Sequence, residues 1–377
     1  MAGLYLHIPF CKSRCIYCGF YSTTSLSLQS QYTEAICKEM TQRKDYITNH
    51  AINTIYLGGG TPSQLSFDNL QHITHYIYNT YNVKQEAEFT IEVNPDDVNN
   101  EFIHNLKQLP INRISIGIQT FNDKLLKLIR RRHTASQAKD AIKSLKDNGF
   151  NNISIDLMFG FPNETIQEWE NDIQQAIELD VQHISAYSLM FEEGTPLYAM
   201  LTNGKVEEIE EEKSLQMYQI LIDRLSTAGY TQYEISNFCK SGYHSRHNSN
   251  YWNNTPYIGI GAAAHSFDGT SRQWNIDNLT EYIDGINNNK RIYEIEELTT
   301  NQKYNERIMT RLRTMEGLNL NSLIKEFGKD KYDYCIKAAT KYIDDKKLYI
   351  NKDNNNMALT RQGLFISNQI MSDLMYV

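Results

Sequence analysis

The residues best suited to do chemistry are three cysteines near the start of the chain. Cys11, Cys15 and Cys18 have the spacing C-x3-C-x2-C, which is typical of metal ligands and not of a disulfide framework. Closed zinc sites and closed [4Fe–4S] sites take four protein ligands, and no fourth Cys or His follows at that local spacing. The pattern therefore predicts a [4Fe–4S] cluster with one iron open to another ligand. The alternatives are three unligated thiols, or a zinc site completed by His7 or by a distant residue.

Further polar and glycine residues lie at the ends of runs that indicate β-strands. The cysteines follow the first such run, and the next four end, in chain order, at Gly58–Pro62, Glu92, Gln119 and Asp156. The carboxyl ends of parallel strands share one edge of a sheet or barrel, and reactive groups gather at that edge. We therefore expect these five strand ends to converge on one mouth.

The strands that would position these residues are short β-rich runs that recur at helix-length intervals. They are Leu4–Ile8, Thr54–Leu57, Phe89–Val93, Arg113–Ile118, Ile153–Leu157 and His183–Leu189. Amphipathic stretches lie between them, at Gln31–Arg43, Phe67–Tyr78, Lys124–Arg131, Ser136–Asn148 and Ile166–Leu179. Crossovers of this size favour parallel pairing. The pattern predicts an α/β fold with an incomplete parallel (β/α)6 barrel; a doubly wound sheet is the alternative.

The rest of the chain divides into two further parts. After a helix near Glu211–Ala228, the segment Tyr230–Gly269 has little periodicity, and we expect an ordered functional loop region there. From about Thr299 the pattern predicts helices, two short strands at Leu348–Ile350 and Met357–Leu359, and a last helix, which is the order of a winged-helix module. We therefore expect a barrel at 1–230, a segment at 231–297 that packs on it, and a small C-terminal domain at 298–377.

The composition of the chain argues against a nucleic-acid-binding function and against a membrane-spanning segment. The net charge of −8 argues against a general binder of nucleic acids, because affinity for phosphate backbones depends on clustered Lys and Arg. Lys and Asp alternate in the C-terminal part, which indicates a solvated surface and not a nucleic-acid interface. No apolar run reaches the length of a membrane span, and the N-terminus lacks a leader pattern. We expect a cytoplasmic location, and a peripheral contact with a membrane stays open.

With Tyr17 directly before the third cysteine, the loop resembles that of the radical S-adenosylmethionine (radical SAM) superfamily. The resemblance implies that the open iron binds S-adenosylmethionine, which electron transfer from the cluster cleaves to a 5′-deoxyadenosyl radical. It also implies that Gly58–Gly60 let the backbone approach the methionyl group, with Thr61 where the superfamily has an acidic residue. The candidate contacts for this cosubstrate are Tyr5, Tyr17, Gly59, Gly60, Thr61, Glu92, Gln119, Arg131 and Asp156.

Four motifs resemble one branch of that superfamily, which contains oxygen-independent coproporphyrinogen III oxidase and a related family of haem chaperones. The motifs are Tyr5–Cys11, Gly58–Pro62, Ile116–Gln119 and Asp156–Gly160. The oxidase has a further cysteine two positions after the third ligand, where this chain has Phe20. It also has a long extension before the first strand, which here begins near Tyr5. Both differences favour a haem chaperone, with the oxidase as the alternative.

A fifth motif favours the chaperone directly. The stretch from His247 to Trp252 reads HNSNYW and fits the H-N-x-x-Y-W motif of the chaperone family. The resemblance implies haem as a ligand, with His247 as the axial ligand and Tyr251 and Trp252 as flat apolar surface for the macrocycle. His265 is a weaker second ligand candidate, and Cys239 is another. The function this implies is transfer of haem to an acceptor protein that the sequence does not name.

Overall fold

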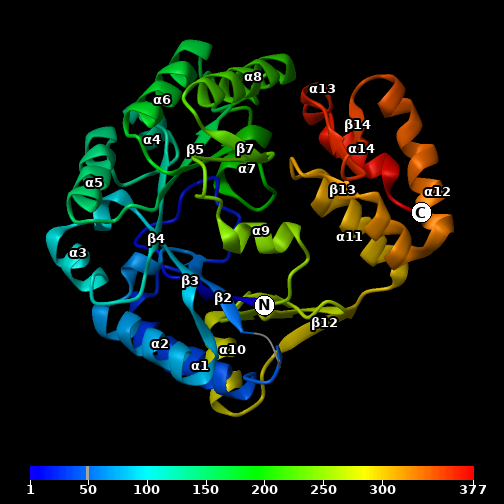
Figure 1. The fold of residues 1–377 in the computed structure, drawn as a ribbon. Helices are drawn as coiled ribbons and strands as arrows, with labels where there is room; N and C mark the ends of the chain where they lie inside the picture. Colours follow the sequence, from blue (N-terminus) through cyan, green and yellow to red (C-terminus); the bar gives the residue numbers. More distant parts are fainter. Residues whose placement is uncertain (48–50) are drawn as a thin grey trace.

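A computed structural model describes residues 1–47 and 51–377 of the chain (Figure 1). Its centre is a run of six parallel strands that pair in chain order. These are β1 (Ala2–Ile8), β2 (Ile52–Gly59), β3 (Val83–Val93), β4 (Arg113–Gln119), β5 (Ile153–Phe159) and β6 (His183–Ser188). All six predicted strands are confirmed. Their outward-facing apolar side chains are buried in the core, as expected for a parallel sheet that is covered by helices.

Helices follow the strands along the chain, and most of them cover the outside of this sheet (Figure 1). These helices are α1 (Gln29–Gln42), α2 (Phe67–Thr80), α3 (Asn100–Leu106), α4 (Asp123–Leu128), α5 (Ala135–Asp147), α6 (Ile166–Glu178), α7 (Pro196–Thr202) and α8 (Glu211–Thr227), with short 3-10 turns η1 (Leu26–Leu28), η2 (Pro62–Gln64) and η3 (Pro95–Asp97). The two short helices α4 and α7 instead pack with Ile16 of the cysteine loop. Thr134 and Thr165 start α5 and α6 with capping boxes, which satisfy the free N–H groups of the first turn. The five predicted crossover helices are thereby confirmed.

The expectation of a loop region at Tyr230–Gly269 is wrong. The segment forms β7 (Thr231–Glu234), β8 (Asn237–Cys239), α9 (Arg246–Trp252), β9 (Tyr257–Ile260) and β10 (His265–Phe267). It is followed by β11 (Ser271–Asn275), α10 (Leu279–Asn287) and β12 (Tyr293–Glu297). Among the described residues these strands extend the barrel sheet at both ends, in the order β12-β11-β10-β9-β1-β2-β3-β4-β5-β6-β8-β7. Strands of three to five residues carry too little alternation to be recognised in a sequence.

The C-terminal part is a separate small core. It contains α11 (Thr300–Leu312), β13 (Leu318–Asn319), α12 (Leu320–Asp344), β14 (Leu348–Asn351), β15 (Asn356–Leu359), α13 (Arg361–Leu364) and α14 (Ser367–Leu374). The three strands form an antiparallel sheet, and α12 kinks at Gly328, which has a φ of 84°. The backbone at this glycine is not helical, so α12 consists of two helices joined at Gly328. The predicted winged-helix order of helices, two short strands and a last helix is confirmed.

The inside of the barrel is polar. Along the first three strands the apolar side chains face the outer helices, so the alternate residues face inward. The inward residues include Tyr5, His7, Thr54, Tyr56 and Glu92. Figure 1 shows α9 lying within the ring of elements, between the strands and the C-terminal domain. No helix in the described part of the chain is long and apolar enough to cross a membrane.

Candidate functional site

The three cysteines lie in the loop after β1, at the carboxyl end of the sheet. All three are half-buried, and none forms a disulfide. The N–H of Cys11 donates to the carbonyl of Thr23 (2.9 Å), and that of Cys18 to the carbonyl of Cys15 (3.4 Å). Burial raises the pKa of Cys11 and of Cys18, and the other two thiols of the loop raise the pKa of Cys18 further. The three thiols are therefore electrostatic neighbours, as ligands of one cluster must be.

The glycine loop after β2 lies against the cysteine loop. Gly60 N donates to Ile8 O at 2.9 Å, and Thr61 N donates to Phe10 O at 2.8 Å. The Thr61 hydroxyl is 3.4 Å from Cys11 Sγ. Gly59 has a φ of 106°, and a Cβ there would overlap the ring of His7. Glycine is required at this position because both the backbone conformation and the close approach exclude a side chain.

Glu92, at the end of β3, holds the glycine loop from the other side. Its Oε2 accepts from Gly59 N at 3.1 Å, and its Oε1 accepts from the Tyr56 hydroxyl at 2.7 Å. Burial raises the pKa of Glu92 to about 7, and the charge of Asp156 adds to this rise, against the opposing effect of the two hydrogen bonds. The carboxyl is thus balanced between its two protonation states near neutral pH.

Arg131 connects the cluster loop to two other strand ends. Its guanidinium donates to Cys15 Sγ (3.6 Å), to Asn94 Oδ1 (2.7 Å) and to the carbonyl of Gly117. Its Nε is buried without a hydrogen-bond partner. The guanidinium thus holds the Cys15 side chain in place at the strand ends, and the free Nε–H remains available to a further acceptor.

The other candidates for cosubstrate contacts differ in depth. Gln119 ends β4 with a φ of 73° and is almost fully buried. Asp156 of β5 lies inside the barrel, where burial raises its pKa and Ser185 opposes that rise by a hydrogen bond. Burial raises the pKa of Tyr17 also, next to the cysteines. Tyr5 lies below the rim, with its hydroxyl 3.0 Å from His7 Nδ1.

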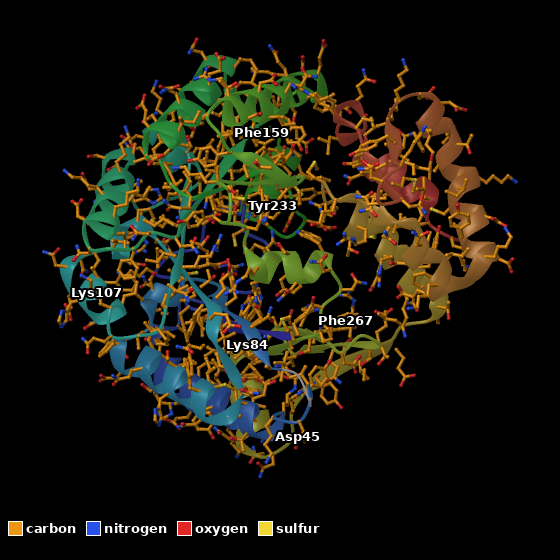
Figure 2. The ribbon with its side chains drawn as sticks, in the orientation of Figure 1. Asp45, Lys84, Lys107, Phe159, Tyr233 and Phe267 are labelled. Atoms are coloured by element: carbon orange, nitrogen blue, oxygen red, sulfur yellow. The ribbon has the colours of Figure 1, made fainter. Side chains whose placement is uncertain are left out.

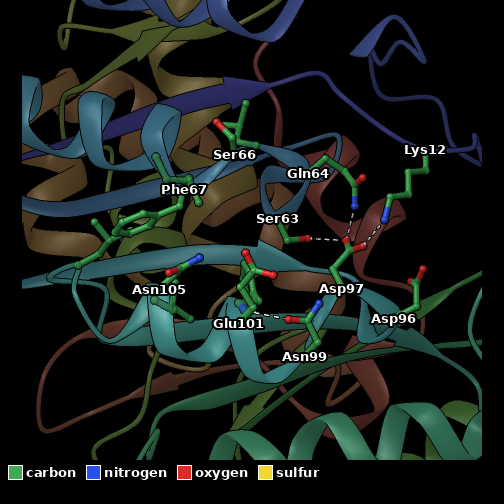
Figure 3. Close-up of a pocket in the computed structure, with 15 residues that line it drawn as sticks. Lys12, Ser63, Gln64, Ser66, Phe67, Asp96, Asp97, Asn99, Glu101 and Asn105 are labelled. Carbon is green, nitrogen blue, oxygen red and sulfur yellow. Dashed lines mark hydrogen bonds and ion pairs between the residues drawn. The ribbon is translucent and has the colours of Figure 1, made fainter. Parts of the chain in front are cut away.

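A buried aspartate anchors the cluster loop to the loops after β2 and β3. Asp97 accepts hydrogen bonds from Ser63 (2.7 Å), from Gln64 and from Lys12 (3.3 Å), the residue after the first cysteine (Figure 3). These residues line a cavity of about 300 Å³ on the outer side of the strand ends. The anchor keeps the cysteine loop in register with the glycine loop.

The haem motif forms α9, and its histidine points into the barrel. His247 is 2% exposed. Its Nδ1 lies 2.9 Å from the Thr54 hydroxyl, and its Nε2 lies 3.1 Å from the Tyr251 hydroxyl. Burial, with the charge of Arg113, lowers the pKa of His247 to about 3. The imidazole is therefore neutral, and in this arrangement both ring nitrogens have partners.

The remaining haem candidates lie apart from the imidazole of His247. The guanidinium of Arg313 lies 5.0 Å from the ring centre of Trp252, so this indole faces the C-terminal domain. His265 of β10 stacks on Trp274 of β11, with their ring centres 5.6 Å apart. Cys239 is fully buried in β8. Among the haem candidates named from the sequence, the structure therefore brings only Tyr251 into contact with the imidazole of His247.

The donor set fits a [4Fe–4S] cluster. Three partly accessible thiols share one loop, and a guanidinium N–H points at one of them. His7, the nearby candidate for a fourth zinc ligand, has both ring nitrogens engaged, by Tyr5 and by the carbonyl of Tyr21. Within residues 1–47 and 51–377, no three His, Cys, Asp or Glu side chains are close enough to hold a single metal ion.

Two residues have roles in the site that the sequence did not predict: His7 was considered only as a zinc ligand, and Asn94 was not singled out. His7 packs under Gly59, and Asn94 joins Arg131 to the Thr61 hydroxyl, to which it donates at 3.4 Å. Asn94 had a sequence signal, because it follows a predicted strand directly. The contact of His7 with Gly59 had no sequence signal, because it depends on the backbone conformation of a distant glycine.

Known families match both parts of the chain. Residues 5–176 match the radical SAM superfamily, and residues 298–366 match the HemN C-terminal domain. The chain also superposes on coproporphyrinogen III oxidase (HemN) from Escherichia coli with a TM-score of 0.86 at 19% identity, over 99% of this chain and 90% of that one. At this identity the likeness shows the shared fold alone. Fold and site define a radical SAM protein, which implies a [4Fe–4S] cluster and S-adenosylmethionine as cofactors.

Full-length relatives identify the family within that class. The chain is 35% identical over 376 residues to a Bacillus subtilis protein named heme chaperone HemW, with 98% of each chain covered. It is 34% identical over 366 residues to the Lactococcus lactis protein of the same name, with 97% of this chain and 95% of that one covered. The chain belongs to the HemW family of radical SAM proteins.

Proposed function

We propose that this protein is a haem chaperone that holds one haem and delivers it to an acceptor protein. The observation that carries the proposal is the joint presence of the cysteine loop and the His247 motif in one barrel, in a chain that aligns end to end with relatives named for haem chaperoning. The acceptor is a protein whose identity the site does not specify.

At the barrel mouth, the cluster would be held by Cys11, Cys15 and Cys18. S-adenosylmethionine would lie on the rim formed by Gly59, Gly60 and Thr61, within reach of the strand-end side chains Tyr17, Glu92, Gln119, Arg131 and Asp156, with Tyr5 supporting the rim from below. Bound there, the pair would supply one-electron chemistry. The protein's own contribution is positioning: Glu92 and His7 fix Gly59, and Arg131 fixes Cys15.

The haem would be bound through Nε2 of His247. Because this nitrogen is paired with the Tyr251 hydroxyl, ligation requires Tyr251 to release it and α9 to expose the ring. The flat faces of Tyr251 and Trp252 would then become available to the macrocycle. We propose that the helix exists in a closed form, which the structure shows, and an open form that binds haem.

The oxidase alternative finds less support. Phe20 occupies the position where the oxidase has a further cysteine, and its ring is 70% exposed beside the cluster loop. The full-length relatives carry the chaperone name, and the likeness to the oxidase structure concerns the fold. Anaerobic assay with coproporphyrinogen III, S-adenosylmethionine and a reductant would detect vinyl product if the chain were an oxidase.

The proposed function gives each of the three parts of the chain a role and accords with a location in the cell. The barrel at 1–230 would hold the cluster and the cosubstrate, the segment at 231–297 would carry the haem motif, and the domain at 298–377 would support that motif. A cytoplasmic location accords with six free cysteines, since cytosolic thiols are kept reduced.

Haem titration followed by visible spectroscopy tests the function. We expect the wild type to bind one haem with a distinct Soret band, and His247→Ala to lose or shift that band because the axial nitrogen is gone. His104→Ala, on the exposed face of α3, is the matched control and should leave the spectrum unchanged. An unchanged spectrum in His247→Ala would exclude the motif as the axial site and direct the same test to His265 and Cys239.

A further inference from the structure

The short helix α9 closes the barrel from the inside and is fixed there by barrel residues. Glu88 of β3 accepts from Arg246 N and from His247 N, both at 2.9 Å. Asn250 Nδ2 donates to the Thr54 hydroxyl at 3.0 Å, the same hydroxyl that contacts His247. Tyr233, labelled near α9 in Figure 2, pairs with Asn248 and with His183 Nε2 (2.8 Å). The helix is thus part of the interior packing.

The imidazole of His247 is stacked on Tyr56, a tyrosine of β2 that lies below the rim. Its ring lies 5.1 Å from that of Tyr56, at an interplanar angle of 26°. Tyr5 lies against both, 6.2 Å from Tyr56 and 6.5 Å from His247. These three rings form one stack on the floor below the rim.

Two paths lead from this stack to the same glycine. Tyr56 donates to Glu92 Oε1, and Glu92 Oε2 accepts from Gly59 N. Tyr5 contacts His7 Nδ1, and the His7 ring packs against the Cα of Gly59. The position of Gly59 therefore depends on two residues whose own positions depend on the ring stack.

We propose that His247 is a positioning residue for the S-adenosylmethionine rim, so that haem and S-adenosylmethionine bind with negative coupling through Tyr56 and Glu92. The inference rests on the proposed function, because it takes Gly59 as part of the cosubstrate rim. Removing the imidazole from the stack, by substitution or by ligation to haem iron, frees the Tyr56 ring to turn. Glu92 then loses a hydrogen-bond donor in a buried setting, where an unpaired carboxylate is costly, and Gly59 loses its fixed position.

The coupling is reciprocal, because linkage requires each ligand to change the affinity of the other by the same factor. Haem bound to His247 should weaken S-adenosylmethionine binding, and bound S-adenosylmethionine should favour release of haem. The cosubstrate thereby gains a role that needs no cleavage: it would promote delivery of haem by holding α9 closed.

The test is calorimetric titration of S-adenosylmethionine into the anaerobically reconstituted full chain, with iron and sulfide measured for each variant. We expect His247→Ala and Tyr56→Phe each to raise the Kd about tenfold. The double variant should be no weaker than either single one, since both act on one path. His247→Phe keeps a ring on Tyr56 but has no nitrogen, so it should bind S-adenosylmethionine as the wild type does while losing haem.

Ser249→Ala is the matched control on the same helix, because within the described residues its hydroxyl donates to the carbonyl of Ser245 and takes no part in the ring stack. Unchanged affinity in Tyr56→Phe, or full additivity in the double variant, would overturn the inference, and Tyr56→Phe decides it alone if His247→Ala fails to fold. Saturating the wild type with haem should raise the Kd by the same factor, and an unchanged Kd would also overturn it. A wild type with a full cluster that binds no S-adenosylmethionine would instead refute the proposed function.

Discussion

Each thiol of the cysteine loop has different neighbours. Cys11 Sγ faces the Thr61 hydroxyl, and Cys15 Sγ faces the Arg131 guanidinium. Burial raises the pKa of Cys18, and a hydrogen bond with the Phe20 backbone opposes that rise. Cluster ligation must offset burial, and hydrogen bonds to sulfur are one means by which a protein does so.

Replacing one ligand should therefore abolish the cluster. Cys15→Ala leaves two thiolates for four irons, and we expect iron and sulfide contents after anaerobic reconstitution to fall to background. Cys37→Ala is the control: Cys37 is buried in α1, away from the loop, and burial raises its pKa to about 12, so the cluster should form fully. A complete cluster in Cys15→Ala would mean that another residue supplies the ligand.

At the scale of elements, α9 is held from its far end by the C-terminal domain. Arg313 lies over Trp252 and 3.8 Å from the buried carboxylate of Glu234. Arg311 donates to Asn253, and the Thr310 hydroxyl donates to Asn254 (3.1 Å). The haem motif is therefore fixed between two parts of the molecule, and the C-terminal domain bears on its opening.

Arg313→Ala should loosen α9. A cation–π contact contributes about 1 kcal/mol, and Glu234 also loses its cation, so we expect hydrogen exchange of the amides at 246–252 to become roughly tenfold faster. Arg307→Ala is the control, because Arg307 on α11 pairs with Glu326 (2.9 Å) within the C-terminal domain. Equal exchange in the two variants would show that the domain does not restrain the helix.

The sequence predicted what depends on local pattern. The six strands and their crossover helices follow from periodicity, and the cluster ligands follow from spacing. The setting of His247 could not be predicted, because its partners Thr54 and Tyr56 come from a strand almost two hundred residues earlier in the chain. The strands β7–β10 around it were missed for the same reason. Each has only three or four residues, and its stability depends on pairing with strands that are distant in the sequence.

At the scale of the whole molecule, the polar interior makes stability depend on pH. Burial lowers the pKa of His133 to about 3, with help from the charge of Arg131, and it lowers the pKa of His183 well below its usual value. His247 behaves likewise. Buried carboxyls oppose this effect: burial raises the pKa of Glu92 and of Glu164 to about 7 and that of Asp172 to about 6, and it also raises the pKa of Asp156 and of Glu234. Ionisation of these groups in the unfolded chain therefore destabilises the fold as the pH rises toward about 7.

Each buried, neutral histidine has its own effect on stability below about pH 6.5. The unfolded chain takes up protons at histidine below that pH, while the folded chain keeps His133 and His247 neutral until about pH 3 and lowers the pKa of His183 well below its usual value. Each of these rings therefore makes the free energy of unfolding fall as the pH falls. Each such ring contributes a slope of about 1.4 kcal/mol per pH unit. His133→Gln keeps a donor for the Ile118 carbonyl, which His133 Nε2 contacts at 3.2 Å, and should reduce the slope by about one proton. Thermal unfolding followed by circular dichroism between pH 7.5 and 5 measures it. His75→Gln, at an exposed position of α2, should leave the slope as in the wild type, and an equal slope in all three proteins would contradict a neutral, buried His133.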